Sequence, residues 1–238
     1  MMENTCSIAE NIKKVQDQII ETCIKYGRKP EDVTLMCVSK TQPVEKLQQA
    51  YDAGITLFGE NRVQELVQKA DFFATNNVPC HIIGQLQTNK VKYLPDLTDT
   101  IQSVDSIKLA KEIEKQYDKA GKVANICLEI NIGMEESKGG VPYDQALDMI
   151  YQLSEFKNLK VKGLMCVPPA DSTENVRKYF AQMHKLFVDI SDKKIDNISM
   201  SILSMGMSGD YPWAIAEGST LVRVGTGIFG ARNYNIVK

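Results

Sequence analysis

Histidine is scarce in this sequence, and the scarcity limits the chemistry that the chain can perform. His81 and His184 are the only two histidines among 238 residues, and they lie far apart along the chain. A zinc site needs several His or Cys ligands at close spacing, and a Ser-His-Asp triad would have to be built around one of these two rings. We therefore expect no metal site, and the composition alone indicates no catalytic residue.

An excess of charge of either sign is also missing. Lysine and arginine total 28 against 30 acidic residues, so no general field attracts nucleic acid or anionic lipid. The longest apolar runs have the length of a strand, and the amino terminus shows no basic segment followed by a hydrophobic one. We expect a cytoplasmic protein that binds a small ligand and contacts neither nucleic acid nor membrane.

A disulfide framework is a third absence. The six cysteines are irregularly spaced, form no Cys-x-x-Cys pair and have no secretory context. We expect most of them to be small buried hydrophobic residues. They are Cys6, Cys23, Cys37, Cys80, Cys127 and Cys166.

Short β-like runs alternate with helical patterns, and no linker interrupts them. Such alternation indicates βαβ units and a parallel sheet, and about eight units close into a barrel of ~250 residues. An open doubly wound sheet is the alternative, but the Gly-rich turn expected after its first strand is missing. Near the amino terminus, apolar residues recur at helical spacing before the stop signals Gly27 and Pro30.

We predict an α/β fold with a single domain over residues 1–238, a (β/α)8 TIM-like barrel with an extra amino-terminal helix over residues 4–26 that packs on the barrel. The expected strands are 33–39, 56–58, 81–83, 100–104, 123–131, 161–167, 198–203 and 221–224.

The first expected strand, VTLMCVSK, ends on Lys40. The lysine stem would lie among core side chains while the amine emerges at the carboxyl end of the strand, where barrel active sites form. Desolvation at such a position makes the neutral, nucleophilic form of an amine accessible, as in lysines that form Schiff bases. On this segment alone, a lysine that extends into solvent is the more common arrangement.

The loops after the last two expected strands, SMGMSGD and GTG, have the composition of an anion site. In barrels a phosphate commonly binds at these two loops, against the amino end of a short helix. The first loop offers the Ser204 hydroxyl and close backbone approach at Gly206, and the second offers the amides of Gly225 and Thr226. Tight turns alone would also explain the glycines, but the pairing of the two loops favours phosphate.

Arg223 lies on the last expected strand, LVRV, where alternation directs it away from its two valine neighbours. An inward arginine needs a partner, and a buried carboxylate such as Glu60, Asp105 or Glu129 is one alternative. Taken with Lys40 and an adjacent phosphate site, the ring nitrogen of pyridoxal 5′-phosphate (PLP) is the other.

Eight segments, in their order along the chain, share one resemblance. They are VTLMCVSKTQP, FGENRVQE, HIIGQLQTNK, SVDS, EINIGMEESKGG, GLMCVPP, LSMGMSGDYPWAI and STLVRVGTGIFGAR. Together they resemble the pyridoxal phosphate homeostasis proteins, the YggS/PROSC family, from the first expected strand to near the carboxyl terminus. The sequence departs from the family pattern at Gln85, where His or Pro often occurs, and at Gly133 and Met134, in place of a more usual Ser-Gly.

The resemblance implies a barrel of the alanine-racemase amino-terminal type that holds PLP as an internal aldimine with Lys40. It also implies that Asn61 hydrogen-bonds near the ring oxygen and that Arg223 faces the pyridine nitrogen. The implied phosphate ligands are Ser204, Gly225 and Thr226, and Met205, Gly206 and Ser208 line the same loop.

The function implied is intracellular PLP homeostasis, with cofactor carried to PLP-dependent apo-enzymes rather than used in catalysis. An arginine at the ring nitrogen disfavours its protonation, so the ring is a poor electron sink. We also expect no room for the extra β-domain that supplies the second base in related racemases, and we expect a monomer.

Two enzyme alternatives stay open. One is a PLP-dependent amino-acid racemase in which Tyr211, His81 or Tyr93 serves as the second base. The other is a Schiff-base aldolase that uses Lys40 without a bound chromophore.

Overall fold

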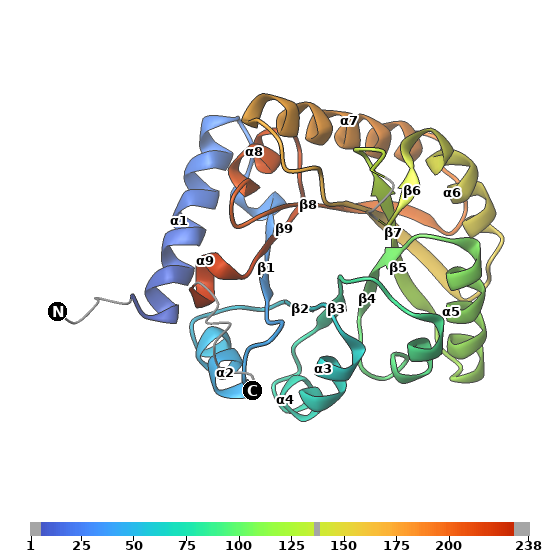
Figure 1. The fold of residues 1–238 in the computed structure, drawn as a ribbon, viewed down its shortest axis with the longest axis horizontal. Helices are drawn as coiled ribbons and strands as arrows, with labels where there is room; N and C mark the ends of the chain where they lie inside the picture. Colours follow the sequence, from blue (N-terminus) through green and yellow to red (C-terminus); the bar gives the residue numbers. More distant parts are fainter. Residues whose placement is uncertain (1–5, 136–138, 231–238) are drawn as a thin grey trace.

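The computed structural model describes residues 6–135 and 139–230, and over these ranges the chain forms a closed parallel barrel surrounded by helices (Figure 1). Within them, eight strands close in the order β4-β3-β2-β1-β9-β8-β7-β5, because β4 also pairs with β5, and a two-residue β6 extends the sheet beside β5. All strand pairs are parallel. The predicted TIM-like barrel is therefore confirmed.

The strands are β1 Thr34–Val38, β2 Phe58–Glu60, β3 Cys80–Ile82, β4 Thr100–Val104, β5 Ala124–Asn131, β6 Val141–Pro142, β7 Leu159–Cys166, β8 Ile198–Met207 and β9 Leu221–Val224. The α-helices are α1 Ile8–Lys25, α2 Val44–Asp52, α3 Val63–Gln68, α4 Ala70–Thr75, α5 Ile107–Lys119, α6 Ala146–Ser154, α7 Thr173–Ser191, α8 Tyr211–Ala216 and α9 Thr226–Phe229. Short 3₁₀ helices cover Pro30–Asp32, Thr88–Tyr93 and Tyr143–Gln145.

The extra helix α1 lies outside the ring and packs against α2, α8 and α9 (Figure 1). It begins at Ile8 because Ser7 caps it. The Ser7 hydroxyl accepts a hydrogen bond from the Glu10 amide at 3.2 Å, and the Glu10 carboxylate accepts one from the Ser7 amide at 2.8 Å. The predicted start at residue 4 is wrong, since residues 6 and 7 precede the helix; residues 4 and 5 themselves lie outside the described ranges.

Strand β8 is longer than the sequence pattern predicts. The expected strand ended at residue 203, but β8 continues to Met207, so Ser204 and Gly206 lie within the strand rather than in a loop. Ser204 is fully buried. Gly206 has a φ of +93°, and a Cβ there would lie 2.6 Å from the Cβ of Ala214 in α8. The glycine that was expected to let a phosphate approach the backbone of a loop instead lets the strand pass close to a helix.

Strand β2 is shifted along the chain from its predicted position. It covers Phe58–Glu60 instead of 56–58, because its ladder with β1 pairs Cys37 with Phe58 and Val38 with Gly59. A Cβ on Gly59 would lie 2.5 Å from the Met36 sulfur, so this glycine serves close packing rather than a turn. The shift places Asn61 directly after the strand. β3 begins and ends one residue before its predicted bounds.

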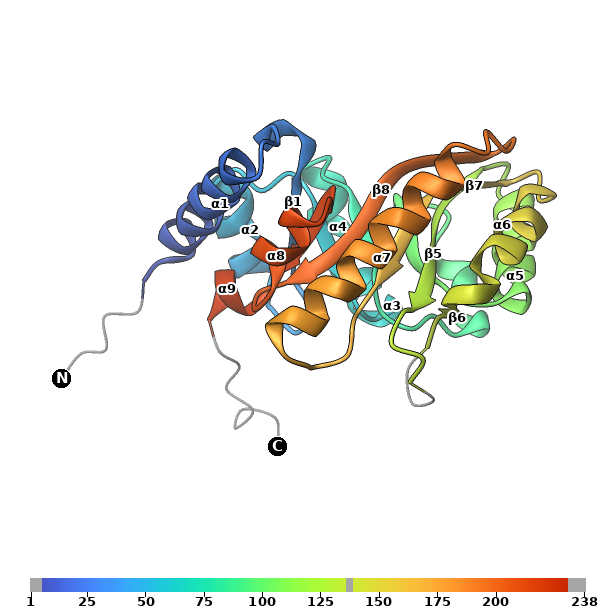
Figure 2. The same ribbon diagram turned by 90° about the horizontal axis from the view of Figure 1, so that it is seen from above.

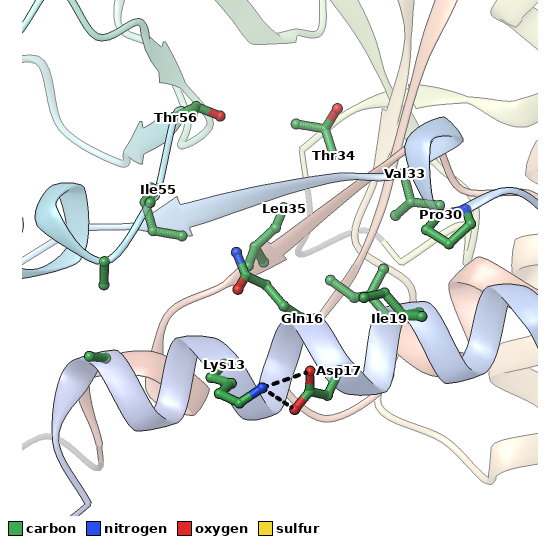
Figure 3. Close-up of a pocket in the computed structure, with 14 residues that line it drawn as sticks. Lys13, Gln16, Asp17, Ile19, Pro30, Val33, Thr34, Leu35, Ile55 and Thr56 are labelled. Atoms are coloured by element: carbon green, nitrogen blue, oxygen red, sulfur yellow. Dashed lines mark hydrogen bonds and ion pairs between the residues drawn. The ribbon is translucent and has the colours of Figure 1, made fainter.

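The groove in Figure 3 lies between α1 and the amino-terminal ends of β1 and β2. Gln16, Leu35 and Thr56 line it, and Lys13 forms an ion pair with Asp17 at 3.2 Å on its wall. This is the end of the barrel opposite Lys40, and barrel sites form at the carboxyl ends of the strands. The candidate site is therefore sought at the other end, toward which β5 and β8 point in Figure 2.

Over the described ranges, no helix is long and apolar enough to cross a membrane, and no three His, Cys, Asp or Glu side chains are grouped as a metal site would require.

Candidate functional site

Lys40 lies in a turn directly after β1, where the sequence predicts it. The strand ends at Val38, Lys40 is half-buried, and the next residue, Thr41, adopts the left-handed conformation with a φ of 62°. Lys40 lines a small cavity together with Gly225 and Thr226 from the turn between β9 and α9. The closed barrel places β1 beside β9, so residues that follow the first and the last strand meet at this cavity.

A buried polar network of Ser39, Glu60 and Lys69 stabilises the turn that contains Lys40. The Ser39 hydroxyl donates to Glu60 Oε1 at 2.6 Å, and Lys69 Nζ donates to the same oxygen at 2.7 Å and to the Ser39 carbonyl at 2.9 Å. Burial raises the pKa of Glu60, while the Lys69 ammonium opposes the rise. On the outer side, Glu65 accepts a hydrogen bond from the Thr41 amide at 2.5 Å. The turn is thus fastened to β2 and α3.

Asn61 presents an unsatisfied acceptor beside this turn. Its Oδ1 is buried and has no hydrogen-bond partner among the described residues. Gly84, at the end of the next strand, permits the close approach of the Asn61 backbone, because a Cβ on Gly84 would lie 2.4 Å from the Asn61 carbonyl oxygen. A buried acceptor without a partner is costly, so a ligand that donates a hydrogen bond would be favoured at this position.

Arg223 lies on β9 inside the barrel and is 4% exposed. Its Nη1 donates to the Ser204 hydroxyl at 2.6 Å, and its Nη2 donates to the Cys166 carbonyl at 2.8 Å. Burial lowers the pKa of Arg223, although a guanidinium stays charged in proteins.

The carboxylate partners considered for Arg223 do not form ion pairs with it in the described ranges. Glu60 pairs with Lys69 instead. Burial, with a smaller contribution from Asp105, raises the pKa of Glu129 to about 7, and the charge of Arg223 opposes this rise. The alternative of a direct Arg223–carboxylate pair is therefore wrong.

Ser204, Met205 and Gly206 do not face the Lys40 cavity as a loop. Ser204 donates to Gln102 Oε1 at 2.6 Å inside the barrel, and Met205 packs in the hydrophobic core. Their proposed contacts with a phosphate stay a prediction. Ser208, in the loop after β8, is the residue of this segment that contacts the β9–α9 turn. Its hydroxyl accepts hydrogen bonds from the amides of Gly225 at 3.3 Å and Gly227 at 3.2 Å.

Of the three residues considered as a second catalytic base, Tyr211 and His81 bond to other side chains and Tyr93 lies at the surface. The Tyr211 hydroxyl donates to Gln18 Oε1 on α1. His81 contacts Gln102 Nε2 through Nδ1 at 2.8 Å and Asp99 Oδ2 through Nε2 at 3.3 Å. Tyr93 is 45% exposed at the end of a 3₁₀ helix.

The sequence analysis missed two residues whose hydrogen bonds support the candidate site. Lys69 and Gln102 act on partners on other elements, so no local motif marks them. Glu60 was the available signal for Lys69, because a carboxylate on a buried strand requires a cation. Residues 136–138 of the EESKGG segment and residues 231 and 232 of the last segment lie outside the described ranges.

Comparisons with known proteins show the family to which this chain is similar. Residues 5–233 match the family described as "Alanine racemase, N-terminal domain". A pyridoxal phosphate homeostasis protein of Pasteurella multocida is 41% identical over 233 residues, which cover 96% of this chain and 99% of that protein.

Solved structures of one further relative superpose over most of the chain. PipY of Synechococcus elongatus without PLP has a TM-score of 0.84 at 32% identity, and PipY with PLP bound has a TM-score of 0.81 at 31% identity. Each covers 94% of this chain and 100% of PipY. This chain thus belongs to the pyridoxal phosphate homeostasis protein family and matches the alanine racemase N-terminal domain over residues 5–233.

Proposed function

We propose that this protein binds PLP covalently through Lys40 and acts in PLP homeostasis, holding the cofactor and passing it on rather than using it in catalysis. The observation that carries the proposal is the small cavity in which Lys40 meets Gly225 and Thr226. The PLP-bound structure of PipY, a family member similar over nearly its whole length, supports the same ligand.

The residues of the candidate site fit the chemical groups of PLP, and three of them, Lys40, Gly225 and Thr226, line the cavity. Lys40 supplies an amine for the aldehyde. The unsatisfied Asn61 Oδ1 would accept from the ring hydroxyl, and Arg223 would donate to the ring nitrogen. The exposed Thr226, through its backbone amide and its hydroxyl, would hold the phosphate. The Gly225 amide already donates to the Ser208 hydroxyl at 3.3 Å, and this bond fastens the turn to the loop after β8.

Two observations support carriage over catalysis. PLP supplies an electron sink to bound amino acids most effectively when its ring nitrogen is protonated. Arg223 has no acceptor site, and its permanent charge disfavours a second positive charge beside it. In addition, the hydroxyl of Tyr211 and the ring of His81 are already engaged with Gln18, Gln102 and Asp99.

We further propose that the protein acts as a monomer in the cytoplasm, with PLP-dependent apo-enzymes as recipients. The six cysteines, all of them within the described ranges, are free thiols, and five are buried. Free thiols in this number support a reducing compartment.

Reduction by borohydride followed by peptide mapping tests the covalent site. We expect the purified protein to be yellow, with the cofactor fixed to the peptide that contains Lys40. Lys40→Ala should remove the absorption band, and Lys40→Arg should not restore it, because a guanidinium stays protonated and does not act as the amine nucleophile. Lys90→Ala is the matched control and should leave the band unchanged. Cofactor fixed to Lys90 or Lys138 would contradict the assignment.

A further inference from the structure

A continuous chain of hydrogen-bonding groups crosses the interior of the barrel behind Arg223. Arg223 Nη1 donates to Ser204 Oγ at 2.6 Å, and Ser204 Oγ donates to Gln102 Oε1 at 2.6 Å. Gln102 Nε2 lies 2.8 Å from His81 Nδ1, and His81 Nε2 lies 3.3 Å from Asp99 Oδ2. We call these five residues the interior relay.

The interior relay connects the proposed cofactor site with the opposite end of the barrel. It passes from β9 and β8 across to β4 and β3, and its last member, Asp99, directly precedes β4. The Ser204 and Gln102 side chains are fully buried, and His81 is 4% exposed, whereas the Asp99 side chain is 51% exposed. Only the far end of the relay is therefore in contact with water.

The hydrogen-bonding direction of the relay is set at Arg223. A guanidinium can only donate, so Ser204 Oγ accepts there and has one proton left to give. That proton goes to Gln102 Oε1, which leaves the Gln102 amide NH₂ facing His81. An NH₂ group can only donate, so His81 Nδ1 must be the acceptor, and the ring proton must lie on Nε2, where Asp99 accepts it.

We propose that the interior relay positions Arg223 for the cofactor and holds His81 as the neutral tautomer with its proton on Nε2. Two donor atoms of Arg223, Nη1 and Nη2, are anchored by Ser204 and by the Cys166 carbonyl. The anchored guanidinium keeps its other N–H groups in a fixed orientation. The part of the proposal that concerns the cofactor rests on the proposed function; the tautomer of His81 does not.

Nitrogen-15 NMR of the imidazole rings tests the relay in protein freed of cofactor at pH 8. With only two histidines, His81→Gln assigns the spectrum, and His184 on α7 serves as an internal reference. We expect one protonated nitrogen on His81, Nε2, and an unprotonated Nδ1. A proton on Nδ1 in the wild-type protein, in either the other tautomer or the imidazolium, would overturn the relay.

Gln102→Glu reverses the direction of the hydrogen bond between residue 102 and His81 Nδ1. Both oxygens of an ionised carboxylate accept, so His81 must then donate from Nδ1. We expect a proton on Nδ1 of His81 in this variant at pH 8, with the His184 signals unchanged. An unprotonated His81 Nδ1 in a folded Gln102→Glu variant whose new carboxyl is ionised, as its carbon-13 shift reports, would overturn the proposal, and if this variant does not fold, the wild-type spectrum still decides.

Gln102→Leu tests the effect on the cofactor. The change leaves the Ser204 hydroxyl without its acceptor and Arg223 less restrained, so we expect PLP to bind about three- to tenfold more weakly, the scale of one lost hydrogen bond between neutral groups. Gln116→Leu, at a Gln on α5 whose amide donates to Glu112 at 2.7 Å, is the matched control and should bind PLP as before. Unchanged affinity in Gln102→Leu would overturn the positioning role. Absence of covalent PLP on Lys40 would instead contradict the proposed function while leaving the His81 result intact.

Discussion

At the scale of single residues, Ser204 could act either as a phosphate ligand or as the hydrogen-bond acceptor that positions Arg223. These two roles predict different ligand preferences. As a phosphate ligand it would favour PLP over unphosphorylated pyridoxal, whereas as the acceptor for Arg223 it would serve both ligands alike. The buried hydrogen bond of 2.6 Å from Arg223 favours the second role. We expect Ser204→Ala to weaken the binding of PLP and of pyridoxal by the same amount, about 1.5–3 kcal/mol, as for a hydrogen bond to a charged group.

Thr226→Ala is the comparison that separates the two roles. Its hydroxyl lies at the exposed turn beside Lys40, so we expect this change to weaken PLP binding by about 1–3 kcal/mol and to leave pyridoxal binding nearly unchanged. Dissociation constants for both ligands in both variants make the test. A selective loss of PLP affinity in Ser204→Ala would return Ser204 to the phosphate site.

Glu129 gives the cofactor-free protein a specific pH dependence of stability. Burial and Asp105 raise its pKa to about 7, so the folded state binds a proton that the unfolded state has released above about pH 4.5. Its contribution to stability is therefore fully present below that pH and is lost as the pH rises through 7. We expect the free energy of unfolding to fall by up to about 3 kcal/mol from this group between pH 5 and pH 8.

Urea unfolding of the wild type and of Glu129→Gln at both pH values isolates this contribution. The amide cannot ionise, so the variant should lose less stability than the wild type on going from pH 5 to pH 8. Equal losses in the two proteins would mean that Glu129 is solvated enough to ionise freely.

The sequence predicted the residues that carry local signals. A lysine at the end of an apolar strand and a Gly-Thr turn after another strand marked Lys40, Gly225 and Thr226, and the structure places all three on one small cavity. Lys69 and Gln102 carry no such signal, because their partners lie on other elements and are defined only once the barrel has closed.

At the scale of elements, the turn after β1 depends on β2 and α3 for its shape. Lys69, which lies just after α3, is 7% exposed and bonds both Glu60 of β2 and the Ser39 carbonyl. We expect Lys69→Met to destabilise the protein by about 3–5 kcal/mol, because it leaves the Glu60 carboxylate buried without its cation. Covalent PLP binding should weaken as well, since the Ser39 carbonyl next to Lys40 loses its anchor.

A second change tests the cause of that loss. Adding Glu60→Gln to Lys69→Met should recover part of the stability, because an amide is less costly to bury than an unpaired carboxylate. Lys13→Met, in the exposed pair with Asp17, is the control and should have little effect. Urea unfolding curves of the four proteins provide the measurement, and a double variant less stable than Lys69→Met would contradict the pairing.

Element order was predictable, but element ends were not. Alternating apolar runs gave the strands, because core burial imposes that pattern. The end of β8 was misplaced, because a Ser-Met-Gly sequence is typical of a loop in water. Inside this barrel the same Ser204 has polar partners and the same Gly206 has a helix against it, and neither neighbour is visible in the local sequence.

At the scale of the whole molecule, closure of the barrel brings residues that follow the first strand and residues of the last strand to one site. β1 lies between β2 and β9, so Lys40, Asn61 and Arg223 come from three adjacent strands. The alternation of strands and helices was sufficient to predict this closure, since about eight parallel units have few other arrangements. It could not predict the polar contents of the barrel interior, where partners from opposite sides meet.

The division between carriage and catalysis belongs to this scale, because it depends on what surrounds the cofactor from every side. We expect the PLP-loaded protein to restore activity to a PLP-dependent apo-enzyme in trans, and to racemise L- or D-alanine no faster than free PLP does. In the proposed site Arg223 would disfavour protonation of the ring nitrogen, and Tyr211 and His81 are bonded elsewhere. The Lys40→Ala protein, incubated with the same PLP and desalted, is the control for transfer and should deliver little cofactor.

Arg223→Glu tests the electronic part of this expectation. A carboxylate at the ring nitrogen favours its protonation, so the absorption spectrum of the loaded protein should shift. Racemisation should nevertheless stay slow, because this change supplies no second base on the opposite face of the substrate. Turnover of about 1 per second or faster in the wild-type protein would place it among ordinary enzymes and contradict carriage. Fast turnover only in Arg223→Glu would instead show that the ring nitrogen, rather than a missing base, is what keeps this barrel from acting on amino acids.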